Sequence, residues 1–300
     1  MFEAIIAAAE KHKTEYHEGF PLSLVTSFKT GGPAALYVLP ADKTARADIL
    51  AACRKEKARC CIVGTGSNRL ISDDGFPGVV IRIGPAFSNV EYLGDGVIAC
   101  DAGESVTGLC NFALKHALTG LEFAFGIPGT AGGAAYMNAG AYGGEMKDVL
   151  QSCAHIAPDG TFGSFSGEQL ALGYRKSVYT DSDYVITKLI LKLQPGDPAA
   201  IRAAMDDKMA RRKAKQPLEY PSAGSTFKRP VGYFAGALIE ECGLKGFTVG
   251  GAQVSEKHAG FVINKGGATT ADILNVIHAV QERVYAQKGV RLETEVKYIG

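Results

Sequence analysis

The pattern of hydrophobic and polar positions predicts a chain in which helices and strands are mixed. Apolar residues recur at helical spacing over residues 2–9, which favours an amphipathic helix at the start. A strand over 35–39, a helix over 44–57 and a strand over 59–63 then form a β-α-β unit that ends in the glycine loop 64–68. The loop therefore follows a hydrophobic strand directly, which is a physically reasonable place for a phosphate-binding loop.

The same rules predict the elements of the remaining chain. Strands over 90–93 and 97–101 form a hairpin around Gly94-Asp95-Gly96, and Ser105 can cap a helix that runs to about residue 118. The break at 194–198 is the clearest domain boundary. Further strands are expected over 79–83, 149–157, 161–165, 184–193 and 291–299, and further helices over 199–215, over 233–242 and from Thr269, which has Asp272 three residues later.

Composition and charge exclude several classes of protein. The 300 residues have a formal net charge of +1, so nothing in the overall charge suggests a nucleic-acid partner. The basic run over 208–215 has no interleaved aromatic residues and is interpreted as a solvated helix face. The seven cysteines form no CxxC pair and have no histidine at metal-ligand spacing, so free thiols and no metal site are expected.

The opening segment does not have the pattern of a signal peptide. Glu3 and Glu10 lie where such a peptide needs uninterrupted apolar residues, and no later segment approaches a membrane-spanning length. The sequence therefore predicts a cytoplasmic protein with no membrane segment.

Glycines and small residues crowd residues 120–144, which lets a ligand approach the backbone closely. Successive backbone N–H groups in such loops form concave sites for phosphates. The loop 64–68 is not a G-x-G-x-x-G fingerprint, so by itself it fits a plain strand-to-helix turn equally well. A second loop over 126–133 favours a dinucleotide, because two glycine loops suit a ligand with two phosphates. The predicted contact residues are Gly64, Thr65, Gly66, Ser67, Asn68, Gly126, Pro128, Gly129, Thr130, Gly132 and Gly133.

Three other segments carry side chains that could take part in chemistry, but their spacing alone favours surface or structural roles over catalytic ones. The segment 174–177 (YRKS) is typical of a surface. Ser225 lies among small residues, yet no His-Asp relay accompanies it, so it does not look like a hydrolase nucleophile. Glu293 and Glu295 project to the same face of the last predicted strand, where solvation at a sheet edge explains two carboxylates.

Taken together, six motifs resemble the UDP-N-acetylenolpyruvoylglucosamine reductase family over nearly the whole chain. They occur in the order that the family has. The motifs are TSFKTGGP at 26–33, VGTGSN at 63–68, GIPGTAGGAAYMNAGAYG at 126–143, YRKS at 174–177, PSAGSTFKRP at 221–230 and LETEVKYIG at 292–300.

The resemblance implies an α+β fold, with a two-subdomain FAD-binding part of the vanillyl-alcohol oxidase type and an α+β substrate-binding domain. FAD would lie across the loops 64–68 and 126–133 without a covalent link. The implied divisions are residues 1–83 with 289–300 for the first FAD-binding subdomain, 84–198 for the second, and 199–288 for the substrate-binding domain.

The resemblance also implies a reaction in two halves, with NADPH as the reductant and UDP-N-acetylglucosamine enolpyruvate as the substrate. Hydride passes from N5 of the flavin to the vinyl carbon, and the product is UDP-N-acetylmuramate for peptidoglycan, and so for cell shape and division. By position in the motifs, Arg175 and Glu295 would stabilise an enolate. Ser225 would donate a proton to the carbon next to the carboxylate.

The sequence departs from the family pattern in two places. Arg229 stands where many relatives carry Asn, and its guanidinium suits the phosphates of UDP. The stretch between Ser177 and Ser225 is short, as in the compact branch of the family that lacks a tyrosine-bearing loop over the substrate. The candidates for substrate contact are Tyr174, Lys213, Lys228, Arg229 and Tyr233.

Two other functions are alternatives. Another flavin oxidoreductase with the same cofactor-binding fold would act on a sugar or a hydroxy acid with oxygen as acceptor, but that wider class does not predict the motifs at 221–228 and 292–296. A nucleotide-binding regulatory protein without turnover is the second alternative. The presence of Arg175, Ser225 and Glu295 together argues against it.

Overall fold

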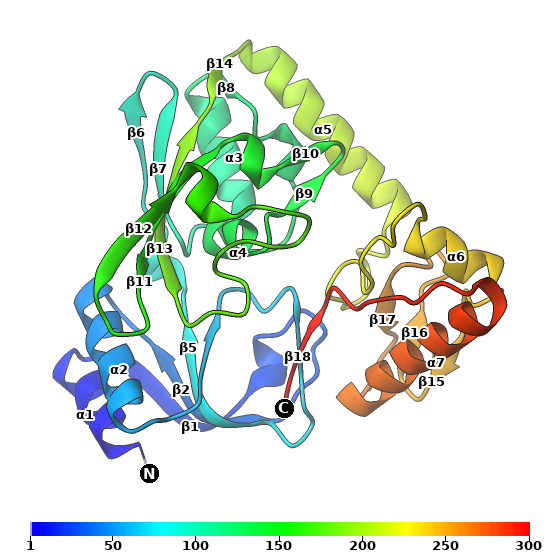
Figure 1. The fold of residues 1–300 in the computed structure, drawn as a ribbon, viewed down its shortest axis with the longest axis horizontal. Coiled ribbons are helices and arrows are strands. Elements are labelled where there is room, and N and C mark those ends of the chain that lie inside the picture. Colours follow the sequence, from blue (N-terminus) through cyan, green and yellow to red (C-terminus); the bar gives the residue numbers. More distant parts are fainter. Residues whose placement is uncertain (1) are drawn as a thin grey trace. The chain divides into compact units, whose positions relative to one another are not determined.

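The computed structural model describes residues 2–300, and their contacts separate the chain into two compact units (Figure 1). The first unit comprises residues 2–17, 36–64 and 79–211, and the second comprises residues 18–35, 65–78 and 212–300. The three-domain division expected from the sequence stays a prediction. The chain passes from one unit to the other after Gly64 and within four elements: β1 (Glu15–Pro21), β2 (Pro33–Leu39), β5 (Phe76–Arg82) and α5 (Pro198–Lys215).

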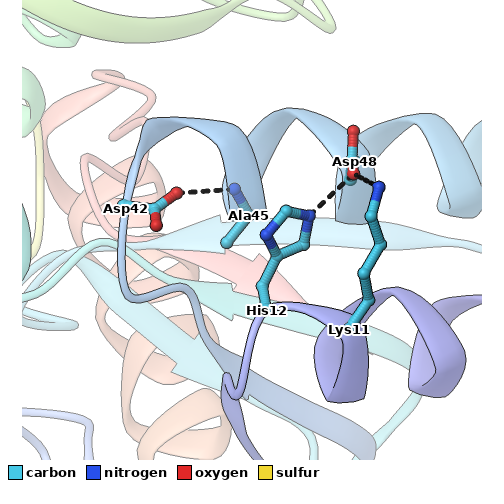
Figure 2. Close-up of polar contacts among 5 residues, drawn as sticks. All are labelled: Lys11, His12, Asp42, Ala45 and Asp48. Carbon is cyan, nitrogen blue, oxygen red and sulfur yellow. Dashed lines mark hydrogen bonds and ion pairs between the residues drawn. The ribbon is translucent and has the colours of Figure 1, made fainter.

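Helices α1 (Glu3–Lys11) and α2 (Lys43–Lys55) of the first unit pack against each other. The Asp42 carboxylate caps α2, since it accepts a hydrogen bond of 2.8 Å from the backbone N–H of Ala45 (Figure 2). Asp48 on α2 accepts hydrogen bonds from Lys11 at 2.8 Å and contacts Nε2 of His12 at 2.7 Å (Figure 2). These contacts, that of Lys11 first, lower the pKa of Asp48. The Lys11 side chain is exposed, so its ion pair with Asp48 adds little stability.

Two sheets organise the first unit. One is four-stranded with the order β1-β2-β5-β3, in which β3 and β5 are parallel. The other is five-stranded and antiparallel with the order β12-β11-β13-β7-β6, and α4 packs on its strands β7 and β13. The elements not yet given are β3 (Cys60–Val63), β6 (Val90–Gly94), β7 (Val97–Asp101), α3 (Val106–Lys115), β8 (Leu118–Thr119), α4 (Ala131–Tyr136), β9 (Gly140–Ala141), β10 (Gly144–Glu145), β11 (Leu150–Ile156), β12 (Phe162–Ser166), β13 (Val185–Lys192) and β14 (Gln194–Pro195).

The alternating burial of β13 shows why this sheet forms. Val185, Leu189 and Leu191 are buried, while every second residue from Lys188 onward is half-buried. The buried face joins apolar side chains of α3, α4 and β7 in one continuous core. Removal of this apolar surface from water is the main force that holds the unit together.

Arg46 is an unusual member of the apolar stripe of α2. Its neighbours on that stripe, Ile49 and Leu50, are buried, and Arg46 itself has no exposed surface. None of its three guanidinium nitrogens has a hydrogen-bond partner among residues 2–300, although the group lies 4.4 Å from the centre of the Phe87 ring. Burial lowers the pKa of Arg46 to about 10, and Asp101 opposes this shift. A buried cation without hydrogen bonds is a cost to folding.

We therefore expect Arg46→Met to raise the free energy of unfolding by about 1–3 kcal/mol, within the range seen when buried charges are replaced by apolar groups. Asp101 keeps Lys188 at 3.6 Å and Lys43 at 4.0 Å, so the substitution leaves that carboxylate paired. Urea unfolding of the two proteins measures the difference, with Arg46→Lys as the charged control. A lower midpoint for Arg46→Met would show that the guanidinium stabilises the fold.

The second unit contains a three-stranded sheet with the order β15-β16-β17, against which helix α7 packs. Helix α7 begins as predicted, because Thr269 and Asp272 form a capping box. Strand β18 pairs in parallel with β4. The elements are β4 (Arg69–Ile71), α6 (Ala235–Glu241), β15 (Thr248–Val249), β16 (Ala252–Val254), β17 (Val262–Asn264), α7 (Thr270–Lys288) and β18 (Lys297–Ile299).

Most of the predicted elements are confirmed within a few residues, including the hairpin β6-β7 and the cap of α3 by Ser105. The strand predicted over 291–299 is wrong in its first part. Residues 293–295 pair with the segment around Phe227, to which Thr294 forms an isolated bridge, whereas β18 pairs with β4. The chain changes its partner between these two pairings, so no single strand forms.

Candidate active site

The two predicted glycine loops meet in the first unit, at Gly64 and Thr130. A Cβ atom on Gly64 would lie 2.7 Å from Oγ1 and 2.9 Å from Cγ2 of Thr130. Such distances are too short for any side chain, so glycine at this position is what allows the end of β3 to touch the loop before α4.

The glycines at the start of α4 are needed for packing. Thr130 caps this short helix, since its Oγ1 accepts a hydrogen bond of 3.2 Å from the N–H of Gly133. The N–H of Gly132 donates to the carbonyl of Ala102 at 2.8 Å, and a Cβ on Gly132 would lie 2.8 Å from the Ala102 Cβ. These two N–H groups are therefore engaged by the protein.

The residues just before the helix have the free backbone groups that a phosphate needs. Gly126 and Gly129 flank Pro128 on a short loop with φ values of 80° and 144°. Among residues 2–300, no acceptor is recorded for the backbone N–H groups of Gly129 and Thr130. Adjacent N–H groups of this kind can bind an anion.

The remaining part of the first loop, residues 65–68, belongs to the second unit. Gly66 has a φ of 66°, and a Cβ there would lie 2.2 Å from the carbonyl oxygen of Val25. Its own carbonyl accepts from the N–H of Ser27 at 3.3 Å. Asn68 donates from Nδ2 to the carbonyl of Glu295 at 3.2 Å. The loop is thus anchored to the segment that carries a predicted acid.

Arg175 lies in a tight turn of the first unit. Gly173 and Lys176 exchange two backbone hydrogen bonds of 2.9 and 3.1 Å across the turn, and Arg175 has a left-handed φ of 54°. Its guanidinium lies 5.1 Å from the centre of the Tyr174 ring and donates to the carbonyl of Gly140 at 3.3 Å. A non-glycine residue in this conformation is strained, and such strain clusters at functional sites.

Ser225 and Glu295 lie on neighbouring segments of the second unit. Ser225 is exposed, and the next residue, Thr226, is held on three sides. Its N–H donates to the Gly260 carbonyl at 2.8 Å, its carbonyl accepts from the N–H of Glu295 at 2.8 Å, and its Oγ1 accepts from the N–H of Val262 at 2.9 Å. The backbone around Ser225 is therefore fixed while its hydroxyl faces solvent.

The two carboxylates predicted on the last strand have different surroundings. The side chain of Glu293 is 74% exposed and pairs with Nζ of Lys228 at 3.0 Å. Glu295 is half-buried, and its backbone is bound on both sides, by Thr226 and Asn68. Glu293 therefore fits a surface ion pair, and Lys228, a predicted substrate contact, already has this partner.

The other predicted substrate contacts lie on the surface. In the second unit, Tyr233 is half exposed, and the guanidinium of Arg229 lies 4.3 Å from the centre of the exposed Phe234 ring. Lys213 is also exposed, and its carbonyl accepts from Nζ of Lys257 at 2.8 Å. Tyr174 belongs to the first unit.

One residue near Arg175 was not predicted from the sequence. Asn138 is completely buried and makes three side-chain hydrogen bonds, one of them to the carbonyl of Gly173 in the Arg175 turn. The available signal was that Asn138 carries the only amide side chain in the glycine-rich segment 126–143.

Two features are absent from residues 2–300. No group of three or more His, Cys, Asp or Glu side chains is arranged to hold a metal ion. Over the same residues, none of the helices has both the length and the apolar character needed to cross a bilayer.

Two family models match separate parts of the chain. Residues 34–166 match the FAD binding domain, and residues 216–299 match the C-terminal domain of UDP-N-acetylenolpyruvoylglucosamine reductase. Among curated proteins, the UDP-N-acetylenolpyruvoylglucosamine reductase of Syntrophomonas wolfei is 48% identical over 93% of each chain. That of Clostridioides difficile is 47% identical over 93% of this chain and 92% of its own.

Solved structures agree with these matches. The crystal structure of UDP-N-acetylenolpyruvylglucosamine reductase from Thermus caldophilus has a TM-score of 0.82 at 34% identity and covers 96% of this chain and 99% of its own. A variant of berberine bridge enzyme, at 15% identity and a TM-score of 0.54, shows likeness of fold alone. The predicted α+β class and FAD as cofactor are confirmed. The chain belongs to the UDP-N-acetylenolpyruvoylglucosamine reductase family and is an FAD-containing oxidoreductase.

Proposed function

We propose that this protein reduces UDP-N-acetylglucosamine enolpyruvate to UDP-N-acetylmuramate with NADPH as the reductant. The observation that carries the proposal is the contact of Gly64 with Thr130, which joins two glycine loops in a chain whose relatives are named as reductases of this type. The product is a precursor of peptidoglycan.

The residues around this contact fit the pyrophosphate of FAD. The N–H groups of Gly129 and Thr130, for which no acceptor is recorded among residues 2–300, would bind phosphate oxygens. The absence of a side chain on Gly64 lets the end of β3 lie against the loop that carries these N–H groups. When bound, FAD supplies the hydride that reduces the vinyl carbon of the substrate. The remaining residues of the loops 64–68 and 126–133 complete the proposed cofactor contacts.

Arg175 and Glu295 are proposed to stabilise the charge that forms on the substrate. Addition of hydride to the vinyl carbon leaves negative charge that spreads into the carboxylate as an enolate. The turn of Arg175 is fixed by backbone hydrogen bonds and its guanidinium donates to the carbonyl of Gly140, so the group needs little reorganisation during the reaction. Glu295, in its protonated form, would share the enolate charge through a hydrogen bond.

Ser225 is proposed to complete the reduction. Its hydroxyl would donate a proton to the carbon next to the carboxylate, which needs only a weak acid because the enolate carbon is strongly basic. The exposed position of Ser225 and the fixed backbone of Thr226 support this role, since they leave the hydroxyl accessible on a backbone that is held in place.

Four residues of the second unit are proposed to bind the UDP part of the substrate: Lys213, Lys228, Arg229 and Tyr233. Arg229 is the strongest of them, because guanidinium groups bind phosphates bidentately and its stacking on Phe234 restricts its rotamers. Lys228 would have to exchange Glu293 for a phosphate. Tyr174 is proposed as a further substrate contact.

An anaerobic titration of the purified protein tests this function. We expect a yellow protein whose flavin absorbance is lost on addition of NADPH and returns only when UDP-N-acetylglucosamine enolpyruvate is added. Recovery of the absorbance with oxygen, but not with this substrate, would indicate an oxidase instead. A protein that cannot be reconstituted with FAD would contradict the assignment of both glycine loops.

A further inference from the structure

Asn138 ends helix α4 in a way that only a few residue types allow. It adopts a left-handed φ of 42° directly after the helix. Its N–H donates to the carbonyl of Ala135 at 3.2 Å, and the N–H of Ala139 donates to the carbonyl of Ala134 at 2.8 Å. This pair of bonds is a Schellman motif, whose left-handed position favours glycine and, after it, asparagine.

The side chain of Asn138 makes hydrogen bonds that a glycine at this position could not make. It has no exposed surface, and all the hydrogen-bonding capacity of its donor group is used. Nδ2 donates to Oε2 of Glu145 at 2.7 Å and to the carbonyl of Gly173 at 3.0 Å, while Oδ1 accepts from the N–H of Lys147 at 2.9 Å. Because the two acceptors lie beside Nδ2 and the one donor lies beside Oδ1, the orientation of the amide is fixed.

The bond to Gly173 connects the glycine-rich segment to the turn that carries Arg175. Two further bonds join the same parts of the first unit: Arg175 donates to the carbonyl of Gly140 at 3.3 Å, and Oγ of Ser177 donates to the carbonyl of Tyr136 at 2.7 Å. Of these links, the one from Asn138 starts from a completely buried side chain and is made at the first residue of the turn.

The turn needs such support because of its conformation. A left-handed conformation is unfavourable for a residue other than glycine, so the φ of 54° at Arg175 persists only where neighbouring groups hold the turn. We propose that Asn138 is a positioning residue, which holds the turn so that the Arg175 guanidinium is aimed at the enolate of the substrate. This inference rests on the proposed function.

Asn138→Gly is the most direct test, because glycine preserves the left-handed end of α4 and removes only the amide. We expect the flavin to be reduced by NADPH at a rate within about twofold of the wild type. Reoxidation by the enolpyruvyl substrate should be slower by about 10- to 100-fold, the loss expected when a charged group is misplaced by an ångström or so. Anaerobic stopped-flow absorbance measures the two halves separately.

Asp42→Ala is the matched control for lost stability in the first unit. It removes the cap of α2, which Figure 2 shows, and touches neither Asn138 nor the turn. It should lower the melting temperature and leave both half-reactions unchanged. If Asn138→Gly yields no folded protein, Asn138→Ser replaces it. Serine adds no charge beside Glu145 and has no amide nitrogen to donate to Gly173.

A double-mutant cycle with Arg175→Met separates a positioning role from a general one. If Asn138 acts through Arg175, adding Asn138→Gly to R175M slows reoxidation by less than about twofold further. The inference would be overturned if the losses of reoxidation rate in the two single variants multiplied in the double variant. It would also be overturned if Asn138→Gly slowed both half-reactions equally, or if it were reoxidised at the normal rate. Failure of the wild type itself to be reoxidised by the substrate would instead overturn the proposed function, and the role of Asn138 with it.

Discussion

Replacing Ser225 by alanine is expected to slow reoxidation of the flavin by the enolpyruvyl substrate by about 10²- to 10⁴-fold, the usual contribution of a positioned proton donor. Reduction of the flavin by NADPH should be nearly unchanged, because that half of the reaction needs no proton from Ser225. The exposed hydroxyl supports no buried hydrogen bond, so folding should be unaffected. Stopped-flow measurement of each half-reaction gives both rates.

Ser222 offers a matched control in the same segment. It lies three residues earlier and is half-buried, and Ser222→Ala should leave both half-reactions at wild-type rates. An equal loss in both halves for Ser225→Ala would contradict its role as proton donor and would point to a disturbed site. A similar loss in Ser222→Ala would lead to the same conclusion.

Replacing Glu295 by glutamine is expected to slow the same half-reaction by about 10²-fold, since an amide shares the enolate charge less well than a carboxylic acid. The backbone at this position is bound by Thr226 and Asn68, so the fold should tolerate the change. Steady-state turnover and the two separate half-reactions both report this effect.

Glu293 makes the comparison specific, because it is also a glutamate of the last segment but is mostly exposed and paired with Lys228. Glu293→Gln should retain near-normal hydride transfer and affect at most the binding of substrate, through Lys228. If Glu295→Gln turns over normally, Glu295 has only the structural role that its spacing alone suggested.

Local patterns predicted much of this fold. The hairpin β6-β7, the cap of α3 by Ser105 and the capping box of α7 each depend on residues a few positions apart, and the structure confirms them. The two glycine loops were also recognised, because glycine-rich segments are visible in the sequence. Their meeting at Gly64 and Thr130 needed the structure, since the two segments are far apart in the chain.

The features that escaped prediction depend on contacts between distant residues. A helical pattern gives no sign that Arg46 is buried, because its long stem lies in the apolar stripe while its charge finds no hydrogen bond among residues 2–300. The division of the last predicted strand follows from two different partners, the segment around Phe227 and β4. Asn138 acts through Gly173, and nothing near it in the sequence indicates that partner.

The pairing of β18 with β4 also sets an order of events during synthesis on the ribosome. Lys297–Ile299 supplies the parallel partner of Arg69–Ile71, and Glu295 supplies the carbonyl that Asn68 binds. The early loop and β4 therefore leave the ribosome long before their partners exist, and domains that depend on such distant contacts fold slowly. Throughout most of translation, β4 would have an unpaired edge, which a nascent chain must protect from other strands.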